Sequence, residues 1–456
     1  MRLVNRISGV FAAAMVAGTL ASAAANNTFL IRNADVYPVV GEEMKGVSVL
    51  VTDGKITEIG AKIVPPKGIK IVEGKGLRVY PGMIDSGTEL GLAEIPSVRE
   101  SVDTGEIGEF MPQLRALVAI NPESEHIPVV RVNGITSVMT YPASSGRGGG
   151  GGAGGQRQYI AGQAALIHLD GWTWEDMEIK RTGAMHIIFP SLGGGRGGRG
   201  GGGGDIPAEV LAQFGLAPGT GTFTEAKRQY DLQIQKLNDF FDDARKYKSA
   251  KSANMPGFKP DLKFEAMIPV LDGKVTCAVS ASRERGIKDA IAWAEKQRIK
   301  IVILQPREIG KAAADLKAKN VPVILGRVLA LPENEDSNYD EAFTLPAEAH
   351  KAGVKFAFGT FNNEFIRNLP YQAATAVSFG LPQAEALKAL TINPAQIWGV
   401  SDQVGSIEKG KWADLMVTDG DPLEASTQVK HLYIKGKEVD LVNKQTRLNE
   451  KYSGRP

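Results

Sequence analysis

The chain has 456 residues, of which 43% are hydrophobic and 23% charged, a composition typical of soluble globular proteins. This length suffices for one large domain and a smaller one. The formal net charge is only +2, from 53 basic and 51 acidic residues, which argues against a nucleic acid or an anionic membrane as partner.

The first 25 residues have the pattern of a secretory signal peptide. Arg2 and Arg6 form a basic start, residues 10–20 form an apolar stretch too short to span a bilayer comfortably, and small residues suited to cleavage follow. We therefore expect an exported protein, periplasmic or secreted, without a membrane span after cleavage. An uncleaved anchor is the alternative. With a single cysteine, Cys277, the chain can form no internal disulfide.

Short strands with tight glycine turns are predicted near both chain ends. Residues 26–78 alternate strand-like runs with turns such as Asp53-Gly54, and residues 399–445 repeat the pattern before a tail at 446–456. Neither segment alone has enough strand to bury a core. We expect the two to combine into one small β-sandwich.

Residues 79–398 alternate strand-like and helical runs, which is typical of a parallel β/α architecture. The stretch 79–92 organises this region. An apolar run passes Pro81-Gly82 and ends in small and polar residues, which predicts a buried strand whose carboxyl end opens into a loop. Asp85 is expected to fix the exit of this strand.

Three insertions interrupt the alternation. Residues 146–155 and 193–204 are almost pure glycine with a few arginines, so they are predicted to be disordered loops. Residues 224–250 are predicted to form one helix, because Tyr230, Leu237 and other apolar residues recur at helical spacing. A packed insertion is expected there, and a partner-binding helix is the alternative.

Several stretches resemble the amidohydrolase superfamily. Residues 79–92 resemble its first barrel strand, which reads Pro-Gly-x-Ile-Asp-x-His-x-His, and residues 391–395 and 405–417 resemble motifs near its carboxyl end. The similarity covers about residues 28–440 and is greatest to the imidazolonepropionase-like and prolidase-like branch. It implies a (β/α)8 TIM-like barrel, a composite β-domain built from both chain ends, and metal-dependent hydrolysis of carbon–nitrogen bonds.

The resemblance also locates the positions at which relatives hold their metal ligands. The two histidines of the first strand are replaced by Gly87 and Glu89. The histidines of the fifth and sixth strands become Ser280 and Gln305, and the aspartate after the eighth becomes Phe361. Side chains of glycine and phenylalanine coordinate nothing, and neutral serine and glutamine are poor ligands for zinc-like ions. No catalytic metal is therefore predicted. A fourth-strand ligand cannot be placed, because no motif fixes the register of residues 185–189.

Two functions remain open, and with them the question of whether the protein is an enzyme. The first is a non-catalytic ligand-binding or partner subunit. Its predicted pocket is lined by Gly87, Thr88, Glu89, Ser280, Gln305, Thr360 and Phe361. The second is a divergent hydrolase of dipeptides or cyclic amides, with one relocated divalent metal held by Glu89, His168 and Asp170. Expected partners are a second copy of the chain, a metal-bearing amidohydrolase relative, or a small-molecule or peptide ligand.

Overall fold

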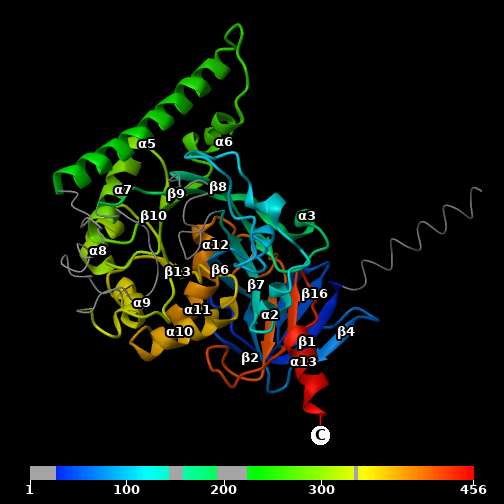
Figure 1. Ribbon diagram of the computed structural model, residues 1–456. Coiled ribbons are helices and arrows are strands. Elements are labelled where there is room, and N and C mark those ends of the chain that lie inside the picture. The colour runs from blue at the N-terminus through cyan, green and yellow to red at the C-terminus, as the bar shows by residue number, and fades with distance from the viewer. Residues whose placement is uncertain (1–26, 143–157, 193–222, 333–336, 456) are drawn as a thin grey trace, which may run out of the picture.

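The computed structural model describes residues 27–142, 158–192, 223–332 and 337–455 (Figure 1). The predicted signal peptide and both glycine tracts lie outside these ranges, so their structure stays a prediction. Within them, no helix has the length and apolar character needed to cross a membrane.

One sheet of eight strands forms the centre of the molecule. Its strands are β6 (Met83–Thr88), β7 (Ile135–Thr140), β8 (Ile160–His168), β9 (Glu178–Ile188), β10 (Thr276–Ser280), β11 (Ile301–Leu304), β12 (Val323–Leu325) and β13 (Phe356–Phe358). They lie side by side in chain order, and β13 also contacts β6, so the sheet is nearly closed. The fold is therefore mixed α/β with a barrel-like sheet, as the sequence predicted.

One strand departs from the regular (β/α)8 pattern. β8 is antiparallel to both β7 and β9, whereas the other neighbouring strands of this sheet are parallel. β8 and β9 form a hairpin whose connection contains the short helix α3 (Trp174–Met177). Antiparallel neighbours need only such a short connection, whereas parallel ones need a crossover. The carboxyl end of β8 consequently lies at the opposite edge of the barrel from those of its neighbours.

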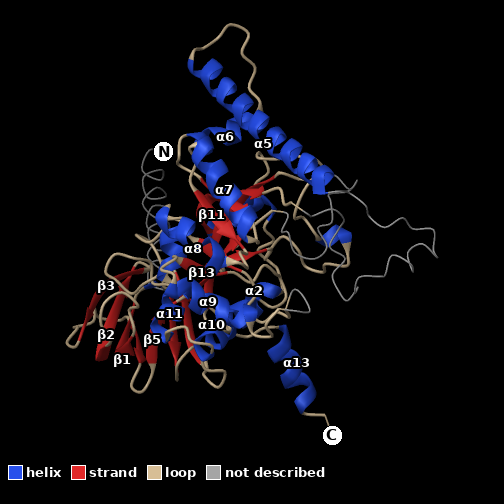
Figure 2. Ribbon diagram, turned by 90° about the vertical axis from the view of Figure 1, so that its left-hand side faces the viewer, coloured by secondary structure: helices blue, strands red, loops and turns tan. Residues whose placement is uncertain are grey.

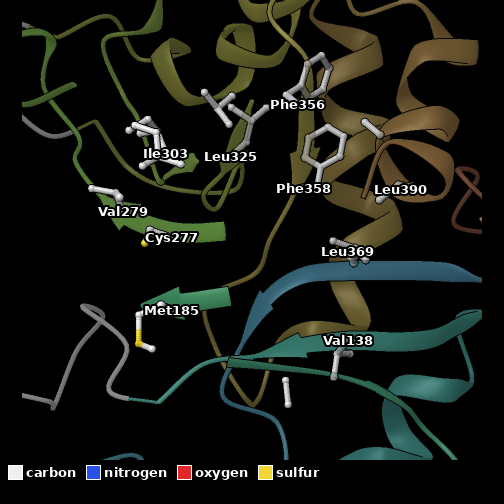
Figure 3. Close-up of a cluster of buried hydrophobic side chains, with 14 of the residues drawn as sticks. Val138, Met185, Cys277, Val279, Ile303, Leu325, Phe356, Phe358, Leu369 and Leu390 are labelled. Atoms are coloured by element: carbon white, nitrogen blue, oxygen red, sulfur yellow. The ribbon is translucent and has the colours of Figure 1, made fainter. Parts of the chain in front are cut away.

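Helices cover the outside of the barrel. They are α2 (His126–Arg131), α7 (Glu284–Gln297), α8 (Ile309–Ala318), α9 (Glu341–Lys351), α10 (Leu369–Ser378), α11 (Gln383–Leu390) and α12 (Ile392–Ile397), with the short 3-10 helices η2 (Arg99–Ser101), η3 (Ala116–Ala119) and η4 (Ile366–Asn368). Figure 3 shows alternate strand residues, such as Cys277 and Val279 of β10, in the same cluster as Leu369 and Leu390 of the helices. Because side chains alternate along a strand, the intervening residues point into the barrel.

The predicted helical insertion is helix α5 (Phe223–Ser252), which packs on α6 (Leu262–Leu271) (Figure 1). Tyr230, Leu237, Phe241 and Ala244 are buried, which explains their helical spacing. The side chain of Phe241 meets the ring of Trp293 on α7 edge-on, with a centroid separation of 5.2 Å. The insertion is therefore anchored to the barrel.

Strands from both chain ends form a second sheet. Its strands are β1 (Phe29–Val36), β2 (Met44–Thr52), β3 (Lys55–Gly60), β4 (Lys70–Glu73), β5 (Arg78–Pro81), β14 (Leu415–Thr418), β15 (Val429–Ile434) and β16 (Lys437–Glu438), and α13 (Lys444–Ser453) follows. The two ends join where β5 pairs with β14 in antiparallel fashion. Figure 2 shows part of this sheet at one side of the helix-covered barrel. Since these strands belong to a single hydrogen-bonded sheet, a two-layered sandwich stays a prediction.

Candidate functional site

The carboxyl ends of β6, β7 and β9–β13 meet at one edge of the barrel, called here the barrel mouth. Asp85 joins the first and last of these strands. Its Oδ1 accepts hydrogen bonds from the backbone N–H groups of Gly87 (2.9 Å) and Thr360 (3.1 Å), and its Oδ2 accepts one from the Thr360 hydroxyl (2.5 Å). Burial raises the pKa of Asp85 to about 7, although these hydrogen bonds oppose the shift. Asp85 thus has the structural role that its position predicted.

The ring of Phe361 packs against Gly87. A Cβ built on Gly87 would lie 2.6 Å from the ring's Cζ, and one built on Gly359 would lie 2.8 Å from its Cε2. Phe361 has a φ of +46°, and its backbone N–H donates to the carbonyl of Gly87 (2.6 Å). Two glycines therefore make room for an aromatic ring between the first and last strands. The resemblance implies that relatives hold metal ligands at two of these positions, 87 and 361.

Further aromatic side chains fill the barrel behind this ring. Tyr141 lies 6.4 Å from Phe361 and 6.4 Å from Trp398 between ring centroids, and the Trp398 indole N–H donates to Ser86 Oγ (3.3 Å). The hydroxyl of Tyr141 is buried and has no hydrogen-bond partner in the described part of the chain. Burial holds its pKa well above the usual range. The interior under the mouth is thus packed with aromatic groups.

Ser280 and His186 form a hydrogen-bonded pair at the same edge. Ser280 Oγ lies 3.1 Å from His186 Nε2, and His186 Nδ1 lies 2.9 Å from the carbonyl oxygen of Pro142. His186 is buried, and burial lowers its pKa to about 4, so the imidazole is neutral near pH 7. The sequence placed Ser280 at the mouth but left the register of β9 open. In the structure, β9 pairs with β10 so that His186 lies opposite Ala278, and this register places His186 beside Ser280.

A cavity of about 540 Å³ opens beside this pair. It is bordered by the ends of β9, β10 and β11 and by α5 and α7, and its lining includes Ser280, Gln305, Arg283, Arg285, Arg307 and Tyr230. The structure thus brings together two residues of the predicted pocket, Ser280 and Gln305.

The other predicted pocket residues are placed differently. Thr88 and Thr360 are each 1% exposed, because their hydroxyls donate to Asn362 O (2.5 Å) and to Asp85. Glu89 is partly buried, and desolvation raises its pKa to about 7. Thr88 and Thr360 therefore hold the strand ends together instead of lining an open pocket.

The predicted relocated metal site is not assembled. His168 ends the antiparallel strand β8, so it lies at the barrel edge opposite Glu89, with its Nδ1 3.4 Å from Asp414 Oδ2. Asp170 pairs instead with Arg131 (3.3 Å) and Lys437 (2.8 Å). The sequence pattern identified the strand but not its direction, and the direction separates these three residues.

The described side chains at the barrel mouth do not fit a divalent metal. Within the described ranges, no three His, Cys, Asp or Glu residues are grouped so that they could hold an ion. At the mouth itself, the ring of Phe361 lies against Gly87, and Ser280 is hydrogen-bonded to His186. These side chains do not supply the ligands of the metal centre that the resemblance implies for relatives.

Comparisons with known proteins agree with this architecture. The model of the amidohydrolase family matches residues 285–439. A solved amidohydrolase structure from Thermotoga maritima MSB8 is 28% identical, has a TM-score of 0.72, and aligns over 90% of this chain and 99% of that one. The chain is thus similar to amidohydrolases, and its residues 285–439 match the family model. The similarity to the solved structure extends over nearly the whole of both chains.

Two further similarities concern a longer relative and a solved prolidase. Amidohydrolase tasK of Hapsidospora irregularis is 24% identical over 444 residues, which are 89% of this chain but 42% of tasK. This chain therefore spans less than half the length of that relative. A solved prolidase complexed with N-methylphosphonate-L-proline is 17% identical, with a TM-score of 0.52 over 91% of this chain and 99% of that one, and shows a shared fold alone.

Proposed function

We propose that this protein is an exported member of the amidohydrolase family that lacks metal chemistry at its barrel mouth and serves as a ligand-binding or partner subunit. One observation carries the proposal: the ring of Phe361 packs against Gly87. Family chemistry needs ligands that hold an ion and activate water, and a phenyl ring supplies neither a donor atom nor a base.

The surroundings of the ring support the same conclusion. Asp85 and Thr360 fix the ends of β6 and β13, and Gly359 as well as Gly87 leaves space for the ring. The aromatic side chain is therefore accommodated by the backbone around it. Restoring a metal centre would require changes at several strand ends at once.

A partner role fits a mouth that lacks metal ligands. We propose that this chain pairs with a metal-bearing amidohydrolase, which would supply the hydrolytic chemistry. The cavity beside Ser280 offers a place for a small ligand, whether or not the chain is bound to a partner.

Metal content and hydrolysis measured on one sample test this proposal. After dialysis without chelator, the protein should contain well under one equivalent of zinc, manganese or iron. Dipeptides and cyclic amides should be hydrolysed at background rates, and Glu89→Ala should leave those rates unchanged. Stoichiometric metal, with turnover abolished by Glu89→Ala, would show that the protein is a metal-dependent hydrolase.

A further inference from the structure

Ser280 and His186 are aligned by the sheet itself. β9 and β10 are parallel neighbours, and His186 stands opposite Ala278 in their register. Ser280 lies two residues beyond Ala278, so its side chain and that of His186 point into the same barrel. This places Ser280 Oγ 3.1 Å from His186 Nε2, the separation of a hydrogen bond.

The contacts of His186 determine which of its two ring nitrogens carries the hydrogen. A backbone carbonyl can only accept, so the contact from His186 Nδ1 to Pro142 O (2.9 Å) requires the hydrogen on Nδ1. Nε2 is then an acceptor, and the hydroxyl of Ser280 donates to it. A serine bonded to an oriented, unprotonated imidazole is the arrangement that activates a hydroxyl as a nucleophile.

The chain contains a second Ser–His contact that lacks access to solvent. Ser137 Oγ lies 3.5 Å from His168 Nδ1, but Ser137 is 0% exposed and His168 is 1% exposed. Ser280, in contrast, is partly exposed and lines the cavity of about 540 Å³. Of these two serines, Ser280 is therefore the one that borders a cavity open to a small molecule.

The cavity lining favours negative charge. Arg283, Arg285 and Arg307 border it, and among the described lining residues Asp289 is the acidic one. Asp289 accepts a hydrogen bond from Tyr230 (2.7 Å) and lies 3.6 Å from Arg285. Each guanidinium group carries several N–H donors in a planar fork, so the arginines that border the cavity suit a carboxylate or phosphate group beside the serine.

We infer that Ser280 is a metal-independent nucleophile, with His186 as its base, that accepts the acyl group of a small ester bearing a negative charge. This goes beyond the proposed function, because it needs neither a metal nor a partner. The Oγ–carbonyl carbon bond forms as His186 Nε2 takes the hydroxyl proton. The bond to the leaving oxygen breaks, and Nε2 gives the proton to that atom, which leaves as the alcohol. Water then attacks the acyl carbon as Nε2 takes a proton from it, the bond from that carbon to Ser280 Oγ breaks, and Nε2 gives the proton to Oγ, which releases the carboxylic acid.

Fast turnover is not expected from this pair. Burial lowers the pKa of His186 to about 4, which makes the imidazole a weak base, and its Nδ1 faces a carbonyl instead of a carboxylate. The pair should therefore acylate and then release the acyl group slowly. A covalent adduct and a burst of leaving group are the appropriate readouts.

Covalent labelling of the full-length protein in EDTA tests the inference. The folded protein is treated with an alkyl fluorophosphonate, and the modified residue is identified by peptide mass spectrometry. We expect one phosphonyl group per chain, on Ser280, and none after unfolding in urea. Ser280→Ala and His186→Gln should each reduce labelling at least tenfold. The matched control Ser137→Ala, which alters the buried pair, should label like the wild type.

An ester assay tests the preference for charge. 4-Nitrophenyl hemisuccinate, which is anionic, should give a larger nitrophenolate burst than 4-nitrophenyl acetate, and Arg285→Gln should reduce that difference. Absence of label on the folded wild type, or label on a residue other than Ser280, would overturn the inference even if a variant fails to fold. Detection of a stoichiometric metal would instead overturn the proposed function and leave labelling of Ser280 unaffected.

Discussion

At the residue scale, the barrel mouth depends on the fit between Phe361 and Gly87. Phe361 adopts a left-handed φ of +46°, which costs a residue with a Cβ about 1–2 kcal/mol. Its burial and its backbone hydrogen bond to Gly87 offset that cost. The sequence predicted that both residues replace metal ligands. It could not predict that the ring contacts the glycine, because that contact depends on how closely β13 approaches β6.

A double-mutant cycle tests this contact. Gly87→Ala should lower the unfolding free energy by about 1–3 kcal/mol, since the new Cβ would lie 2.6 Å from the ring. Phe361→Ala should lower it by about 3 kcal/mol because a buried ring is removed. Gly87→Ala should cost much less when Phe361 is already alanine. Gly286→Ala is the control, because its Cβ would meet only Ala281 Cβ at 3.9 Å. Additive effects in urea unfolding would contradict the contact.

Tyr141→Phe should leave stability unchanged or raise it by about 1 kcal/mol. The hydroxyl of Tyr141 is buried without a partner in the described chain, so its removal recovers a desolvation cost. Tyr230→Phe is the matched control and should lower stability by about 1 kcal/mol, because the Tyr230 hydroxyl donates to Asp289 (2.7 Å). Thermal unfolding of both variants provides the comparison. A clear loss in Tyr141→Phe would show that its hydroxyl is satisfied.

Asp85 should make stability depend on pH. Its pKa is raised from 3.8 to about 7 in the folded protein, so the unfolded chain releases this proton first as pH rises. Asp85 therefore lowers stability progressively between about pH 4 and pH 7. Asp85→Asn removes this contribution, so its stability relative to wild type should improve from pH 5 to pH 8. Urea unfolding at both pH values measures the difference, and parallel pH profiles would refute the assignment.

At the element scale, periodicity predicted that strands and helices exist but not how every strand runs. The apolar run of β8 fits a parallel or an antiparallel strand equally well, since side chains alternate in both. Because β8 is antiparallel, His168 lies at the barrel edge opposite Glu89, and the three residues of the alternative relocated metal site are not brought together. The pairing of His186 with Ser280 was missed for a related reason. It follows from the register of β9 against β10, which no motif revealed.

Helix α5 gives the clearest test at this scale. Phe241→Ala should lower the unfolding free energy by about 3–5 kcal/mol, because the side chain is 0% exposed and packs on Trp293. Leu232→Ala is the control on the same helix, where a side chain that is 49% exposed should change stability by less than about 1 kcal/mol. Equal effects of the two substitutions on the urea midpoint would mean that α5 is not anchored through this face.

At the scale of the whole molecule, the sequence predicted the main architecture because its signals are long and repeated. Glycine turns at both ends indicated a shared β-domain, and the structure joins these ends through β5 and β14. Alternating strands and helices indicated the barrel, whose sheet is nearly closed. The arrangement of the shared β-domain as a sandwich depends on how strands bend and pack, which local patterns do not encode.

Anomalous diffraction from crystals soaked in zinc tests the absence of a catalytic metal most directly. Data collected at the zinc edge should show no peak among Gly87, Glu89, Ser280, Gln305 and Phe361, and the ring of Phe361 should lie against Gly87. A fully occupied zinc ion bound by Glu89, with the ring displaced from Gly87, would contradict the account.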